Sequence, residues 1–243
     1  MSRSDDADDT VRRRSGWLIP LGVFVVTLAL SAMFLLFYLA PTPPPLFSEQ
    51  VSPTSSTEIV SLEVNGLKLW VPANYFEFDS ARRGGTHREV ALFAKLPTLT
   101  GWSNWDAQSF DDNASNSRIV YLLIRDERLN LSEAERLRRV YLAYVADPKG
   151  KPGPFGLTQY AFLPDSGYRG EDLFVGETPN GPAVLRCVRY GPDVPSPSCL
   201  RDIRLARGVA LSYRFKRAQL KHWRDIGDGV DKLMALFQKP PAK

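Results

Sequence analysis

The chain has 243 residues and a formal net charge of +4, from 31 basic and 27 acidic side chains. So small a positive excess is not typical of nucleic-acid-binding proteins, and we expect no nucleic-acid partner. The two histidines and two cysteines form no H-x-x-x-H or clustered-cysteine pattern, so we expect no metal site and no cofactor.

An uncharged apolar run over residues 17–40 is the first feature along the chain. At about 1.5 Å of rise per residue, a helix over this run could cross a bilayer core of about 30 Å. The alternative is a cleaved signal peptide, whose apolar region is usually roughly 7–15 residues long. Here the run is longer and Pro41 follows it. We therefore predict an uncleaved, single-pass transmembrane signal anchor.

The charges that flank this run predict its orientation. Arg12, Arg13 and Arg14 come just before it, whereas the first basic residue after it is Lys68. Because basic flanks remain in the cytoplasm, residues 1–16 are predicted to be a cytoplasmic head. We expect a bacterial inner-membrane protein whose remaining chain lies in the periplasm.

A stretch rich in proline, serine and threonine follows over residues 41–58. Pro43, Pro44 and Pro45 favour a stiff, extended backbone, so we interpret this stretch as a linker. Residues 59–243 are numerous enough to form one globular domain with a sizeable core.

The domain is predicted to begin with a hairpin. Apolar and polar residues alternate over 60–64 and 67–71, and Asn65-Gly66 between them favours a two-residue type I′ turn. Further strands are expected over 88–95 and 118–125. The second of these is apolar on both faces, as in a central strand.

A helix is predicted to follow these strands. Ser132 and Glu135 form an S-x-x-E capping box, and apolar residues repeat at helical spacing until Asp147-Pro148. The segment 148–156 is rich in proline and glycine and is predicted to be irregular.

Short strands, one longer strand and a helix are predicted for the last part of the chain. Short strands are expected near 157–163, 172–177, 183–189 and 200–206. Alternation over 209–215 places Ser212 and Arg214 opposite an apolar face, and an apolar stripe predicts a helix over 218–238. Together these elements predict an α+β domain with a largely antiparallel sheet and two helices packed on one face.

Cys187 and Cys199 flank a segment with several prolines that must turn back on itself. In an oxidising compartment, such a pair indicates a disulfide, which would join the strands near 183–189 and 200–206. Two buried free thiols or a redox pair are the alternatives, although a redox pair favours C-x-x-C spacing.

Catalytic and metal-binding patterns are scarce. No residue is assigned a catalytic role, and His87, in a basic glycine-containing turn, is the candidate general base that we name. His222 is interpreted as a helix-surface residue. Residues 111–116 alternate oxygen-bearing side chains as a calcium loop does, but the expected glycine at the sixth position is absent. We interpret them as a polar connecting loop.

Three loops, over 82–87, 101–106 and 148–156, carry residue types that favour contact with another molecule. Arginines beside glycines can bind an anion, and aromatic side chains in loops are frequent in binding surfaces. Solvated arginines and aromatic residues that cover the core are the alternatives. The candidate binding residues are Arg82, Arg83, Trp102, Trp105 and Phe155.

An anchor, a spacer and a rigid domain favour a non-enzymatic module that binds another envelope protein. An immunity-type protein and an accessory subunit of an envelope or secretion complex both fit this interpretation. A second hypothesis is an envelope hydrolase acting on cell-wall or lipid substrate, which would need His87 or a buried carboxylate as its base. A third is a binder of anionic lipid or glycan that uses the basic segment 201–243.

Overall fold

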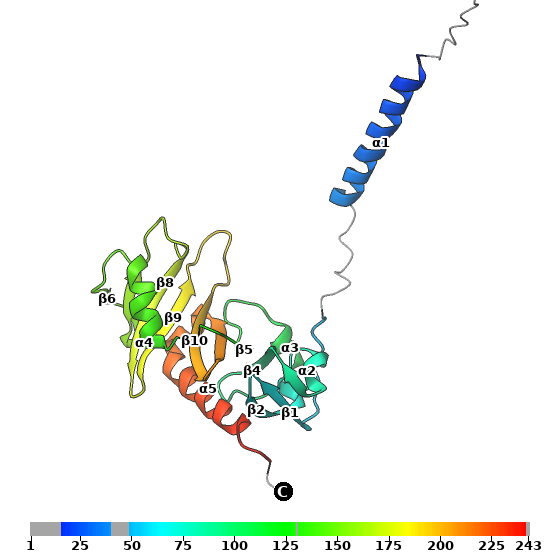
Figure 1. Ribbon diagram of the computed structural model, residues 1–243. Helices are drawn as coiled ribbons and strands as arrows, with labels where there is room; N and C mark the ends of the chain where they lie inside the picture. Colours follow the sequence, from blue (N-terminus) through cyan, green and yellow to red (C-terminus); the bar gives the residue numbers. More distant parts are fainter. Residues whose placement is uncertain (1–15, 40–48, 130, 242–243) are drawn as a thin grey trace, which may run out of the picture. The chain divides into compact units, whose positions relative to one another are not determined.

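The computed structural model describes residues 16–39, 49–129 and 131–241 of the chain (Figure 1). The chain divides between Glu49 and Gln50 into two compact units. Residues 1–15, which make up most of the predicted head, lie outside the described residues. So do residues 40–48, which include the first part of the predicted linker.

The described part of the first unit, residues 16–39 and 49, contains one helix, α1 (Leu18–Leu39). Its segment Ile19–Tyr38 is apolar, with a mean hydropathy of 2.4. This length and composition suit a membrane span, and a signal sequence near an N-terminus has the same properties.

A small three-stranded sheet opens the second unit. Strands β1 (Ile59–Val64) and β2 (Leu67–Pro72) form the predicted antiparallel hairpin. Asn65 and Gly66 connect them with φ angles of 45° and 85°, which are the positive values that a type I′ turn requires. The unpredicted strand β3 (Gly85–His87) pairs in parallel with β1.

An eight-stranded sheet forms the centre of the second unit, with strand order β4-β5-β11-β10-β9-β8-β7-β6 and antiparallel pairing throughout. The strands are β4 (Glu89–Lys95), β5 (Ile119–Asp126), β6 (Lys151–Pro152), β7 (Thr158–Ala161), β8 (Glu171–Thr178), β9 (Gly181–Val188), β10 (Ser198–Ala206) and β11 (Val209–Lys216). The predicted α+β class with a largely antiparallel sheet is therefore confirmed.

Short helices connect the strands. They are the α-helices α2 (Asp79–Arg82), α3 (Ala107–Asp111) and α4 (Glu133–Arg139) and the 3₁₀ helices η1 (Ala73–Tyr75), η2 (Tyr141–Tyr144), η3 (Pro154–Gly156) and η4 (Arg217–His222). Ser132 and Glu135 form the predicted capping box of α4. The sequence predicts an irregular segment over 148–156, but the structure has two short elements there. Residues 151–152 pair with β7 and form β6, and η3 follows.

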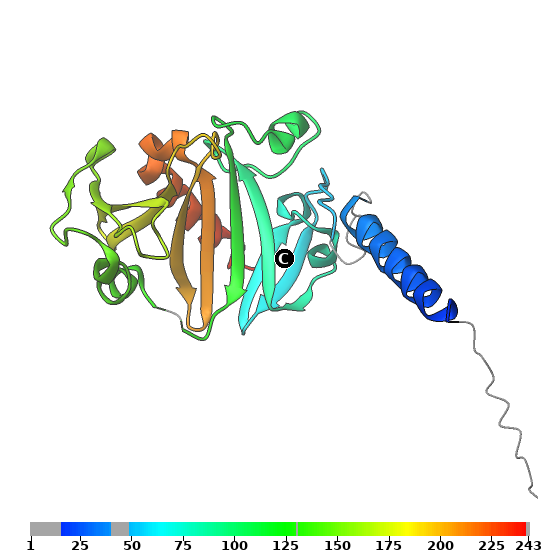
Figure 2. The same cartoon turned by 90° about the horizontal axis from the view of Figure 1, so that it is seen from above.

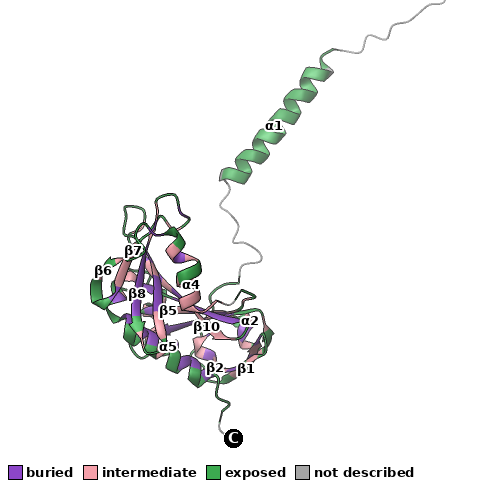
Figure 3. Ribbon diagram, turned by 60° about the vertical axis from the view of Figure 1, so that its left-hand side comes forward, coloured by how far each residue is buried: buried purple, intermediate pink, exposed green. Residues whose placement is uncertain are grey.

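The last helix, α5 (Trp223–Phe237), presents the predicted apolar stripe to the main core. The predicted helix over 218–238 is in fact the 3₁₀ helix η4 followed by α5. Figure 2 shows α5, in red, crossing behind the strands of the large sheet. Buried residues follow these strands and the inner side of α5 (Figure 3).

Helices cover both faces of the large sheet, which corrects the prediction that they pack on one face. Helices α4 and η2 form a second apolar cluster with Leu173, Val175 and Val184. Phe174 and Leu185, which point to the opposite face, belong to the core beneath α5. Because β8 and β9 are apolar on both faces, each face needs a cover.

Candidate protein-binding groove

Among the described residues, no helix covers the middle of one face of β4, β5, β11 and β10, where side chains of these strands line a hollow. On the other face, these strands contribute Leu92, Leu122, Leu211 and other residues to the core that includes α5. Helix α3 closes one end of the uncovered face, where Phe110 packs edge-on against Phe93 with ring centroids 4.8 Å apart. The open face between α3 and α4 forms a groove of about 380 Å³.

The floor of this groove combines apolar and polar side chains, as protein interfaces do. It includes Ala91 from β4, Tyr121 and Leu123 from β5, Leu200 from β10, and Ser212 and Arg214 from β11. Tyr121 and Leu123 are half-buried, whereas Leu122 between them is buried in the core. The second apolar face of β5 therefore forms the groove floor rather than a second core.

Asp202 connects the elements at the end of the groove nearest α4. Its carboxylate accepts a hydrogen bond from the Ser212 hydroxyl. The guanidinium groups of Arg136 and Arg186 lie 3.5 Å and 3.8 Å from it. Arg186 also pairs with Glu171 at 2.8 Å. These interactions hold β9, β10, β11 and α4 together, so the wall of the groove is a fixed surface.

Arg214 lies in the middle of the groove and is exposed. Its guanidinium carbon lies over the Tyr121 ring, 5.1 Å from the ring centroid, in a cation–π contact. Burial raises the pKa of the Tyr121 hydroxyl, and the nearby Glu77 carboxylate adds to this effect. Burial also raises the pKa of Glu77, which Arg214 partly opposes. An ordered cation therefore stands beside a half-buried carboxyl group.

A second hollow of about 280 Å³ shares Tyr121 and Arg214 with the first. At its border, the Lys216 ammonium donates to the Asn113 side chain at 2.6 Å and to the Ser196 carbonyl at 3.3 Å. Desolvation lowers the pKa of Lys216, and Arg214 adds to the shift. Lys216 thus ties two loops together at the rim, which extends the groove toward α3.

Arg82 and Arg83 line a different hollow, beside β1. Arg82 pairs with Asp79 at 2.8 Å and donates to the Ser52 carbonyl at 2.5 Å. Arg83 is exposed. The Arg82 guanidinium therefore holds the chain segment before β1 against α2. Because these contacts already use several of its N–H groups, fewer remain to bind an anion.

Trp102 and Trp105 lie in a loop that is well held. The backbone N–H of Trp102 donates to the backbone carbonyl of Asn74 at 2.7 Å. In return, the side-chain amide of Asn74 donates to the backbone carbonyl of Trp102 at 3.1 Å. Asp106 forms an ion pair with Lys95, which lowers the pKa of its carboxyl group. Trp105 is 95% exposed, so the interpretation that it covers the core does not apply to this residue.

Phe155 is 55% exposed and has a φ of 57°, which is rare for a residue with a side chain. Its carbonyl accepts a hydrogen bond of 3.2 Å from the indole of Trp223, the first residue of α5. The three predicted loops thus lie over different elements, and their binding roles stay predictions.

His87 lies in β3 and is half-buried. Its Nε2 is 3.0 Å from the Gly84 carbonyl, so this nitrogen carries the hydrogen and donates it within the same turn. His222 is exposed, with Nδ1 3.8 Å from Asp225. Neither geometry is that of a base poised beside a nucleophile.

No group of three metal-ligating side chains occurs in the part of the chain that the structure describes. In the segment with calcium-like alternation, the Asn113 side-chain oxygen accepts from the Lys216 ammonium. Asp112 instead accepts from the Ala114 N–H at 2.8 Å. An ammonium at this oxygen opposes the binding of a cation there.

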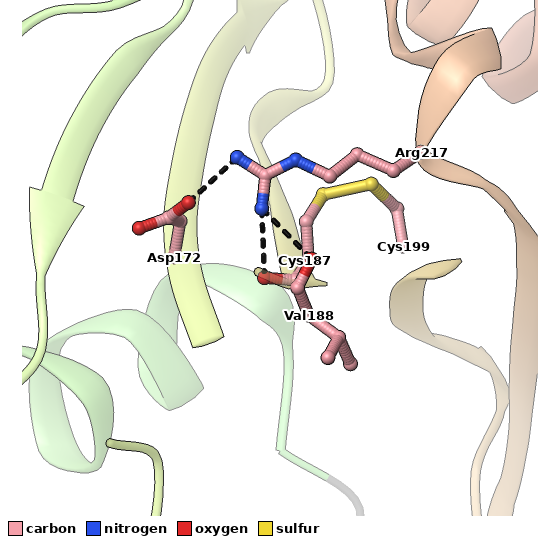
Figure 4. The surroundings of a disulfide bond; sticks show 5 residues. All are labelled: Asp172, Cys187, Val188, Cys199 and Arg217. Carbon is pink, nitrogen blue, oxygen red and sulfur yellow. Dashed lines mark hydrogen bonds and ion pairs between the residues drawn. A yellow bond between two sulfur atoms is a disulfide. The ribbon is translucent and has the colours of Figure 1, made fainter. Parts of the chain in front are cut away.

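Cys187 and Cys199 are register partners on β9 and β10 and are joined by a disulfide (Figure 4). Arg217 donates to the Val188 carbonyl at 2.8 Å and forms an ion pair of 2.6 Å with Asp172. Burial opposes the charge on Asp172, but hydrogen bonds from Arg217 and Arg189 outweigh it and lower the pKa of this carboxyl group. The disulfide is therefore embedded in a paired polar network.

Sequence reasoning missed the groove, although it gave one signal of it. The alternation over 209–215 correctly directs Ser212 and Arg214 away from the core. Their partners Tyr121 and Asp202 come from other strands, and no local pattern connects them.

No protein-family model matches this chain, and no curated protein matches it. Among solved structures, the chain is similar to an immunity protein of the Stenotrophomonas maltophilia type IV secretion system. The TM-score is 0.54 at 16% sequence identity, and the likeness covers 75% of this chain and 94% of that protein. At this identity, the comparison establishes a shared fold.

Proposed function

We propose that this protein is an immunity-type module, anchored in the bacterial inner membrane, that binds a secreted protein toxin in the periplasm and blocks its action. The likeness to an immunity protein over 94% of that protein's length carries the proposal. The groove supplies the binding surface, because its fixed walls and mixed floor resemble the make-up of protein interfaces. Tyrosine and arginine, both present there, often dominate binding energy.

The anchor and its orientation are part of this proposal. Helix α1 is long and apolar enough to span a membrane, and Arg12, Arg13 and Arg14 precede it. A disulfide also fits an oxidising compartment. We expect an alkaline phosphatase fused to the C-terminus to be active and the protein to remain in the membrane after a carbonate wash. An inactive phosphatase fusion, or release of the protein from the membrane by the wash, would contradict the anchored periplasmic arrangement.

Capture and neutralisation together test the binding function. The full-length, tagged protein is purified in mild detergent with its bound partner, and that partner is then expressed in the periplasm of a sensitive host. We expect growth arrest, which co-expression of the wild-type chain relieves.

A matched pair of variants assigns this protection to the groove. Leu123→Arg places a charge on the groove floor and is expected to abolish protection. Leu129→Arg changes a leucine that is already 72% exposed outside the groove and should protect fully. A partner that is harmless in the periplasm, or equal protection by both variants, would overturn the proposal.

A further inference from the structure

Arg214 differs from the other charged groups of the groove in what it contacts. Asp202 faces Arg136, Arg186 and Ser212. Lys216 donates to Asn113. Among the described residues, no carboxylate lies at ion-pair distance from Arg214, whose guanidinium instead lies over the Tyr121 ring. Arg214 is therefore the exposed cation of the groove that has no ion-pair partner.

The contact with Tyr121 prepares this guanidinium for a ligand. A guanidinium held over an aromatic ring by a cation–π contact still has N–H groups to donate, and these groups match the two oxygens of a carboxylate. The ring also restricts the arginine side chain before binding, which lowers the entropy lost when a ligand binds.

Glu77 interacts with Arg214 electrostatically, but its carboxylate is not at ion-pair distance from the guanidinium. Glu77 is half-buried at the groove border, where burial raises the pKa of its carboxyl group and Arg214 opposes this shift. Its backbone N–H donates to the Ala91 carbonyl at 3.2 Å, which fixes the segment beside β4. The apolar side chains of Leu123 and Leu200 line the same groove as Arg214. The surface thus combines an unpaired positive charge with apolar contacts.

We propose that Arg214 receives an aspartate or glutamate side chain of the bound protein, with apolar neighbours of that residue packing on Leu123 and Leu200. This inference rests on the proposed function and names the chemistry of its partner: a surface segment with one acidic residue between apolar ones. Charge complementarity supports it, because Arg214 is an exposed cation with no carboxylate at ion-pair distance among the described residues, and apolar side chains line the same groove.

A random peptide library displayed on phage provides a probe that does not depend on the natural partner. The full-length protein in phosphatidylcholine nanodiscs is panned, and clones are kept when the Leu123→Arg protein fails to bind them. We expect the kept peptides to contain an aspartate or glutamate flanked by apolar residues. Changing that residue to its amide should weaken binding at least tenfold.

A double-mutant cycle locates the acidic contact. Arg214→Gln should weaken wild-type peptides at least tenfold but leave the amide peptides nearly unaffected, because the interaction is already lost. Arg224→Gln is the matched control, since Arg224 also lies over an aromatic ring, 4.2 Å from the centre of Trp223, but on α5. It should bind like the wild type.

The inference is overturned if the kept peptides lack an acidic residue, if Arg214→Gln binds them normally, or if panning gives no clone sensitive to Leu123→Arg. These results are distinguishable from failure of the proposed function. A toxin that is captured and neutralised through Leu123, but bound equally well by Arg214→Gln, would leave the immunity function standing and remove the carboxylate contact.

Discussion

The two halves of the large sheet differ in what covers the face that points away from α5. Strands β8 and β9 have apolar cover on both faces, and Asp172 in β8 is paired with Arg217 and Arg189. Strands β4, β5, β11 and β10 have a core on one face and the groove on the other, where Arg214 has no ion-pair partner among the described residues. From this difference we propose that the open half serves recognition, while the covered half, with apolar packing on both faces, contributes to stability.

The largest effect is expected where the two halves join. Strands β9 and β10 pair over only a short register, and Glu133 of α4 accepts from the Val184 N–H and pairs with Arg201 at 2.8 Å. Arg201→Met would leave the Glu133 carboxylate, whose side chain is 14% exposed, without its cation. We expect a loss of about 3–5 kcal/mol of unfolding free energy, measured by urea denaturation.

A second variant separates the lost ion pair from lost packing around Arg201. Arg201→Met combined with Glu133→Leu removes both charges and should recover much of the stability, because no unpaired buried charge remains. A double variant as unstable as the single one would show that packing of the Arg201 stem, and not the charge pair, joins the halves.

The disulfide joins β9 of the covered half to β10 of the open half, and its removal is expected to loosen the edge of the covered half. Cys187→Ala with Cys199→Ala should cost about 2–4 kcal/mol, because opened states in which β9 has separated from β10 are no longer constrained by the cross-link. Hydrogen exchange followed by mass spectrometry should show faster exchange in β8 and β9 and little change in β4 and β5. Equal acceleration in all four strands would contradict the division into two halves.

Asp172 makes the covered half sensitive to acid. Its folded-state pKa is lowered, so its stabilising contribution is present above its ordinary pKa of 3.8 and is lost as the pH falls below it. Asp172→Asn should therefore reduce stability by about 1–3 kcal/mol at neutral pH, and this difference should shrink near pH 3. Asp193→Asn, in an exposed loop, serves as the control. A difference that does not change with pH would contradict the assigned role of the charge.

The smallest stability effect is expected in the groove. Leu123 is half-buried, so Leu123→Ala should cost less than about 1 kcal/mol, whereas Leu173→Ala, a fully buried residue of the covered half, should cost about 2–5 kcal/mol. Thermal denaturation of the two variants compares the halves directly. Similar losses at both positions would mean that the groove floor is as important for stability as the covered half.

Local patterns in the sequence predicted the elements better than their arrangement. Asn65-Gly66 identified the first hairpin, and the capping box at Ser132 identified the start of α4. The apolar character of 118–125 on both faces indicated a central strand, but not that one face would remain open. That outcome depends on where α3 and α4 pack, which is decided by contacts far apart in the sequence.

The groove could not be assembled from spacing alone. Tyr121 meets Arg214 because β5 pairs with β11 in one particular register, Arg214 opposite Tyr121. Asp202 meets Ser212 through the pairing of β10 with β11. The loop aromatics stood out in the sequence because they are unusual there, whereas the groove residues are ordinary members of strands and become a surface only through pairing.

Photo-crosslinking in living cells shows whether the groove contacts the bound protein. The full-length chain carries benzoylphenylalanine at position 123 or 200 in the groove, or at position 129 outside it. We expect a crosslink to one secreted protein from positions 123 and 200, and none from 129. Crosslinking from 129 alone, or no crosslink from either groove position in cells that the protein protects from toxin, would show that the open face of the sheet is not the binding surface.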